Sequence, residues 1–163
     1  MDHVKVKTAL IFTLPERLMT NTACCYSIPF FESLLMSALY LWFNALTYAV
    51  FALWCTLQPT STSQTLGYLS LSPSGQSEYA TVYGGLQWGL ALLFALFAMK
   101  PELRRTGVLA AILLYAPIVL YRLISLTQNA PLETLTYAVA ALEVTMLIAA
   151  VAIWFARTRH QRS

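Results

Sequence analysis

Four long apolar stretches, separated by polar segments, dominate the chain. The segment from Ser33 to Ser77 contains no Asp, Glu, Lys, Arg or His, and its apolar part covers about residues 35–57. A helix needs about 20 apolar residues to cross a bilayer, and each stretch has that length. The sequence therefore predicts an all-α fold, an integral membrane four-helix bundle. Its expected spans are about 35–57, 79–99, 107–126 and 134–155.

The overall composition supports a membrane location. Hydrophobic residues make up 58% of the 163 residues and charged residues only 10%, whereas a soluble domain carries about 25% charged residues. A chain of this length has room for one bundle. We expect a cytoplasmic N-terminal arm over residues 1–32, a transmembrane domain over 33–157 and a cytoplasmic tail over 158–163. Met36 lies at the start of the first span, so a start of the natural protein at Met36 is the alternative to such an arm.

The positions of the basic residues predict the orientation. Nine of the ten Lys and Arg residues lie before the first span, in the turn at 100–106 or after the fourth span. The loops at about 58–77 and 127–133 contain neither residue. Loops rich in Lys and Arg remain on the cytoplasmic side, so both termini and the 100–106 turn are predicted to be cytoplasmic. No basic run is interleaved with aromatic residues, which argues against a nucleic-acid partner.

Two ionisable residues interrupt the later spans. Glu143 lies about ten residues into the fourth stretch, hence about 15 Å deep. Arg122 lies one turn before the predicted outer end of the third. Charged groups at such depth face the protein interior and pair with one another or mark a functional site. Arg122 is expected to pair with Glu143, or alternatively with Glu78 at the outer rim.

Further polar groups lie at similar depths in the first two spans. Asn44 and Tyr48 belong to one stripe of the first span, at three- and four-residue spacing. Tyr83 and Gln87 share a face of the second. Because the cytoplasmic halves of all four spans are almost wholly apolar, the pattern favours a pocket that opens outward over a through-pore. An ordinary packing face is the alternative for the first-span stripe. The predicted pocket residues are Glu78, Tyr83, Gln87, Arg122, Glu143, Asn44 and Tyr48.

Small residues and cysteines give two further expectations. The G-x-x-x-G spacing of Gly85 and Gly89, with Gly84 beside it, predicts close helix packing. The three cysteines and two histidines show no metal-ligand spacing, so no metal site is expected. No cofactor can be named from the sequence.

Several of these residues also carry a resemblance to a known family. Glu78, Gly84, Gly85, Arg122 and Glu143 match positions of a bacterial family of four-pass membrane proteins that is defined only as a domain of unknown function, DUF4345. The chain is also distantly similar to the DoxX-like proteins. The resemblance covers about residues 36–157 and implies a four-helix bundle in the bacterial inner membrane. It implies no activity.

Three functional classes are compatible with this sequence. The first is a membrane binding or accessory protein whose polar pocket holds a small ligand, a lipid or a partner subunit. The second is a proton-coupled small-molecule transporter that uses Glu143, although no inverted repeat or inward polar path is present. The third is an intramembrane enzyme, for which neither a nucleophile nor a paired-carboxylate motif is evident. The binding protein is the favoured interpretation, with no catalytic residues predicted and the oligomeric state left open.

Overall fold

The computed structural model describes residues 22–129 and 132–160, and nearly all of them are helical. Neither range contains a strand, which confirms the predicted all-α fold. In chain order the elements are α1 (Thr22–Leu57), α2 (Pro59–Thr65), α3 (Pro73–Tyr79), the π-helical η2 (Ala80–Leu86), α4 (Gln87–Met99), the short 3-10 turn η3 (Pro101–Leu103), α5 (Arg104–Asn129) and α6 (Thr134–His160).

Four helical segments are long and apolar enough to cross a membrane. The first and fourth, Leu35–Leu57 and Thr134–Ala156, agree with the predicted spans to within one residue. The second and third, Pro73–Met99 and Pro101–Asn129, are longer than predicted. The chain is therefore a multi-pass membrane protein.

Local capping explains the two longer spans. The hydroxyl of Ser72 accepts a hydrogen bond from the backbone N–H of Gly75 at 3.2 Å, and Pro73 occupies the first helical position, where its missing N–H is not needed. At the C-terminal end of α5, the side-chain amide of Asn129 donates to the carbonyl of Ser125 at 3.1 Å. Polar residues that were expected to form loops therefore extend the helices.

The chain divides by its internal packing into two units, Met1–Glu32 and Ser33–Ser163. Every contact described below lies within the second unit. Most of the predicted arm over residues 1–32, and the last residues of the predicted tail, 161–163, lie outside the described residues.

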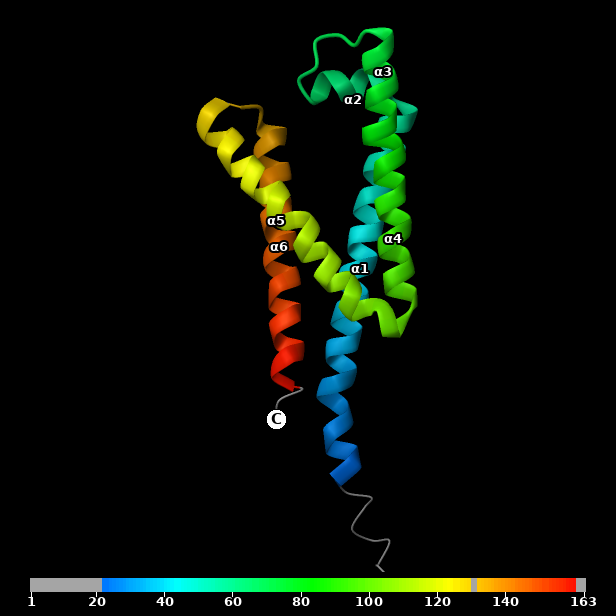
Figure 1. Ribbon diagram of the computed structural model, residues 1–163, viewed down its shortest axis with the longest axis vertical. Coiled ribbons are helices and arrows are strands. Elements are labelled where there is room, and N and C mark those ends of the chain that lie inside the picture. The colour runs from blue at the N-terminus through cyan, green and yellow to red at the C-terminus, as the bar shows by residue number, and fades with distance from the viewer. Residues whose placement is uncertain (1–21, 130–131, 161–163) are drawn as a thin grey trace, which may run out of the picture. The chain divides into compact units, whose positions relative to one another are not determined.

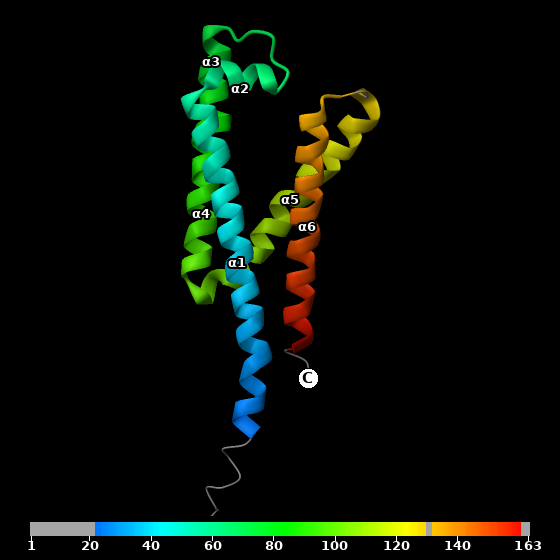
Figure 2. The same cartoon turned by 180° about the vertical axis from the view of Figure 1, so that it is seen from behind.

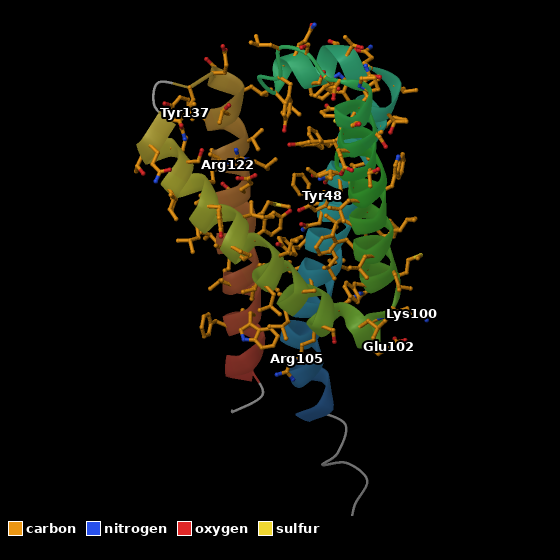
Figure 3. All side chains as sticks on the ribbon, turned by 45° about the horizontal axis from the view of Figure 1, so that its top comes forward. Tyr48, Lys100, Glu102, Arg105, Arg122 and Tyr137 are labelled. Atoms are coloured by element: carbon orange, nitrogen blue, oxygen red, sulfur yellow. The ribbon has the colours of Figure 1, made fainter. Side chains whose placement is uncertain are left out.

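Within the second unit the spans associate in pairs. Helices α5 and α6 lie along one another, and α1 lies beside α4 (Figures 1 and 2). One buried cluster joins all four helices, and it includes Leu41, Phe94, Val108 and Met146. The turn with Lys100, Glu102 and Arg105 lies at one end of this unit, as Figure 3 shows. The apolar cluster therefore fixes the helices whose polar residues form the candidate site.

The closest glycine contact is at Gly107, near the start of α5. A Cβ atom there would lie 2.7 Å from the Cβ of Phe97 and 3.0 Å from a methyl group of Leu41. A side chain at this position would therefore overlap α4 and α1. Only glycine allows α5 to begin so close to both helices.

Of the glycines predicted to pack in the second span, Gly84 faces another helix, whereas Gly85 and Gly89 face none in the described part of the chain. Gly84 is buried, and a Cβ atom there would lie 3.4 Å from the hydroxyl of Thr56 on α1. Cβ atoms at Gly85 and Gly89 would meet no atom of the described chain within 4 Å. The prediction assumed a uniform α-helical face, but Gly84 and Gly85 lie in η2, where each π turn holds an extra residue. A Cβ atom at Gly84 would make an ordinary van der Waals contact, so the helix approach at this position does not require glycine.

Candidate functional site

A bidentate ion pair joins the third and fourth spans. Nε of Arg122 donates to Oε2 of Glu143 at 2.9 Å, and Nη2 donates to Oε1 at 2.8 Å. The side chain of Glu143 is 14% exposed and that of Arg122 is 32% exposed. Two parallel charge-assisted hydrogen bonds fix both position and orientation. The predicted pairing of Arg122 with Glu143 is confirmed, and Glu78, the alternative partner, is exposed near the start of the second span.

The pair forms where α5 and α6 pack against each other. The two residues face each other across this helix pair, and Arg122 lies on α5 beyond Pro117. A proline inside a helix frees the carbonyl four residues earlier and permits a kink. Membrane helices tolerate such a break where neighbouring helices satisfy the freed group. The guanidinium is therefore held by the packing of two helices.

Two tyrosines from the other helix pair lie near the ion pair. Arg122 lies within electrostatic range of Tyr83 on η2, and Glu143 within electrostatic range of Tyr48 on α1. Figure 3 shows Tyr48 on the side of α1 that faces α5 and α6. The ring of Tyr48 stacks on Phe94 with 5.8 Å between ring centroids. Four of the predicted pocket residues are thus grouped in one region.

A second polar cluster is neutral and deeply buried. Asn44 has no exposed surface; its Nδ2 donates to the carbonyl of Tyr40 at 2.8 Å, and its Oδ1 accepts from the hydroxyl of Tyr115 at 2.8 Å. The hydroxyl of Tyr40 donates to the carbonyl of Met146 at 3.0 Å. These bonds connect α1 with α5 and α6. Asn44, predicted as a pocket residue, is instead a buried connector between helices, which corresponds to the alternative interpretation of its stripe.

Two of the predicted residues take no part in either cluster. Glu78 is exposed, and Gln87 is half-buried with no hydrogen bond to its amide within the described part of the chain. Tyr115 was missed, although it precedes Arg122 by seven residues and therefore lies on the same face of α5. A search for polar residues at helical spacing from Arg122 would have found it.

The N-terminal part of the second span carries a tyrosine cluster. The rings of Tyr79 and Tyr83 stack with centroids 4.7 Å apart, and the hydroxyls of Tyr68 and Tyr83 lie 3.2 Å apart. Next to this cluster, α2, α3 and the segment between them enclose a cavity of about 300 Å³. None of the seven predicted pocket residues lines it. The cavity is therefore separate from the Arg122–Glu143 pair.

The fold and these polar groups define a four-span membrane protein with a charged pair inside the bundle. Comparison with family profiles matches residues 36–155 to a family described as a domain of unknown function, DUF4345. The match covers more than half of the chain, so this protein belongs to that family. No curated protein and no solved structure matches the chain. The distant similarity to DoxX-like proteins stays a prediction.

Proposed function

We propose that this protein is a binding protein of the bacterial inner membrane whose Arg122–Glu143 pair holds a small amphipathic molecule from the outer side. The observation that supports the proposal is the partial exposure of an ion pair within the spans. A pair that served only to join α5 and α6 would be most stable with both groups covered, because unpaired donors within a bilayer find no water. The exposed part of Arg122 therefore suggests a ligand.

The unused donors of Arg122 indicate what such a ligand carries. A guanidinium has five N–H donors, and the two bonds to Glu143 leave three of them available. Tyr48 and Tyr83 lie in the same region, and the half-buried ring of Tyr48 offers an apolar face. These groups suit a molecule with carbonyl or ester oxygens and an apolar body, such as a quinone or the glycerol-ester region of a lipid.

Proton-coupled transport is less compatible with this geometry. A Glu143 that carried protons would release Arg122 in every cycle, which would leave a charge uncompensated within the spans. Breaking a buried pair in this way costs about 3–5 kcal/mol. Binding requires no such step.

A co-purification experiment tests the proposed ligand. The full chain would be purified in nanodiscs and examined by native mass spectrometry for a bound amphiphile. The doubly substituted Arg122→Gln, Glu143→Gln protein removes both charges together and so leaves neither unpaired. Arg105→Gln is the matched control. The guanidinium carbon of Arg105 lies 5.2 Å from the centroid of the Trp154 ring. Both residues are far along α5 and α6 from Arg122 and Glu143.

We expect a specific adduct on the wild-type and Arg105→Gln proteins and its loss from the doubly substituted protein. A lipid and a quinone would be told apart by the mass of the adduct. Equal adducts on all three proteins, or none on the wild type, would refute the proposal. Circular dichroism on each sample would establish that the helices are intact.

The orientation within the membrane is a separate part of the proposal. The turn at 100–106 and the C-terminus are proposed to be cytoplasmic, because they hold most of the basic residues. Reporter fusions after Arg105 and after Ser163 should give cytoplasmic signals, and one after Ser72 an external signal. An external signal after Arg105 would contradict this orientation.

A further inference from the structure

The cavity lined by α2, α3 and the segment between them differs from the Arg122–Glu143 site in its chemistry. Its polar lining comes from Thr60, Ser63, Gln64, Ser70, Gln76 and Tyr79, and its other lining residues are apolar. All of them lie in the described part of the chain, and none is charged. A site without charged groups gives no advantage to an ion, because the ion would lose hydration without gaining a counter-charge.

The two glutamines bring hydrogen-bonding capacity that the protein itself does not use. Neither the Gln64 amide nor the Gln76 amide has a hydrogen-bond partner within the described residues. Each side-chain amide supplies two donors and one acceptor. Hydroxyl groups donate and accept, so they match an amide in both directions. The lining therefore favours a ligand rich in hydroxyl groups over one that only accepts hydrogen bonds.

One wall of the cavity is held in place by buried contacts. Thr62 and Ser63 are buried in α2, and the hydroxyl of Tyr79 donates to that of Thr62 at 2.8 Å. The ring of Tyr79 is held in turn against Tyr83. These contacts connect α2 to the start of the second span. A pocket with fixed walls binds its ligand with a smaller loss of freedom.

The volume of the cavity suits a small ligand. About 300 Å³ is the lower limit for typical ligand pockets and equals the liquid volume of roughly ten water molecules. The cavity also lies beside the first residues of the second span. The ends of a span lie near the lipid headgroups, so a headgroup is one source of such a ligand. Leu69, which lines the cavity, is 96% exposed and so offers an apolar surface at its edge.

We infer that this cavity binds a neutral polyhydroxyl group of about the size of one sugar ring. Gln64 and Gln76 hold it through paired hydrogen bonds with its hydroxyls, and the apolar lining residues contact its C–H faces. The group belongs either to a free sugar or to the headgroup of a neutral glycolipid. The site is independent of the ligand proposed for Arg122 and Glu143.

The experiment compares neutral and charged probes of similar shape. The full chain would be purified in a detergent without a sugar headgroup and transferred to phosphatidylcholine nanodiscs. Saturation-transfer NMR would measure binding of glucose and of glucuronate, which adds a carboxylate to the same ring. Native mass spectrometry would measure retention of glucosyl-diacylglycerol against phosphatidylglycerol in the same nanodiscs.

Two variants separate the cavity from the rest of the surface. Gln64→Ala combined with Gln76→Ala removes both free amides from exposed positions, so the fold is retained. Gln128→Ala changes an exposed glutamine of α5 that does not line the cavity. We expect saturable binding of a neutral probe that is at least roughly tenfold weaker in the first variant and unchanged in the second.

Each outcome either supports or overturns the inference. Binding of glucose alone identifies a free sugar as the source, and selective retention of the glycolipid alone identifies a headgroup. Equal binding of glucuronate and glucose overturns the inference, as does undiminished binding by the doubly substituted protein. Failure of both neutral probes to bind the wild type also overturns it.

Discussion

The two polar clusters inside the bundle differ in charge and in exposure. The Asn44 cluster is neutral, has no exposed surface at Asn44, and satisfies that side chain through Tyr40 and Tyr115. The Arg122–Glu143 pair is charged, and a third of the Arg122 side chain is exposed. A buried cluster with all its partners in place specifies how helices pack. A charged pair that remains partly exposed keeps hydrogen-bond donors available for a ligand. Polarity within a span therefore does not by itself identify a binding site, and exposure is the property that separates these clusters.

The largest effect that tests this comparison should come from breaking the ion pair. Changing Glu143→Leu leaves Arg122 within the spans without a partner, which should lower the free energy of unfolding by about 3–5 kcal/mol. The measurement is unfolding of the purified protein in mixed micelles. The combination of Arg122→Leu with Glu143→Leu should recover part of the loss, because no uncompensated charge remains.

A double-mutant cycle supplies the control for this result. The changes in unfolding free energy caused by substituting Arg122 and Glu143 should be strongly coupled. The changes caused by substituting Arg122 and Glu78 should be additive. Additive losses of unfolding free energy for Arg122 and Glu143 would mean that solvation of the ion pair removes its contribution to stability. The contrast between the two clusters would then be lost.

A smaller effect is expected in the neutral cluster. Changing Asn44→Leu leaves the buried hydroxyl of Tyr115 without its acceptor, which should cost about 1–3 kcal/mol in unfolding free energy. Adding Tyr115→Phe removes the orphaned group and should recover most of the loss. Gln87→Leu is a matched control, since the Gln87 amide has no partner to lose. If Asn44→Leu cost no more than Gln87→Leu, the cluster would not hold the helices together.

The smallest effect concerns the apolar contact that supports both clusters. Changing Gly107→Ala places a methyl group against Phe97 and Leu41. Overpacking costs about 1–3 kcal/mol, of which the better helix propensity of alanine offsets about 1 kcal/mol. Gly89→Ala, in open space, should instead raise the thermal midpoint slightly. A lower midpoint for Gly89→Ala would indicate that this face contacts another chain.

Hydropathy and charge placement predicted the fold closely, because a bilayer imposes strong constraints. The spans follow from length and apolar content, and the partner of Arg122 follows from the scarcity of charge within them. Both arguments depend on what lipid excludes. Neither needs any detail of side-chain packing.

The sequence was less informative where the answer depended on helix register. The faces predicted for Gly85 and Gly89 assumed 100° per residue, and η2 breaks that assumption. The close approach at Gly107 has no motif around it, since it arises from Phe97 and Leu41 on two other helices. The cavity lined by α2 and α3 was equally hidden, because an uncharged loop rich in Ser, Thr and Gln predicts no particular structure. The glycine faces of the second span, the close contact at Gly107 and the cavity all depend on contacts between distant segments.

The position of the ion pair on consecutive spans also bears on how the chain enters the bilayer. Arg122 and Glu143 are only 21 residues apart, on two helices that pack directly against each other. Spans that are neighbours in the chain leave the insertion machinery one after the other. The third and fourth spans form a hairpin in which each charge meets its partner as the two helices reach lipid. Pairing within one hairpin spares the nascent chain a period in which either charge faces hydrocarbon alone.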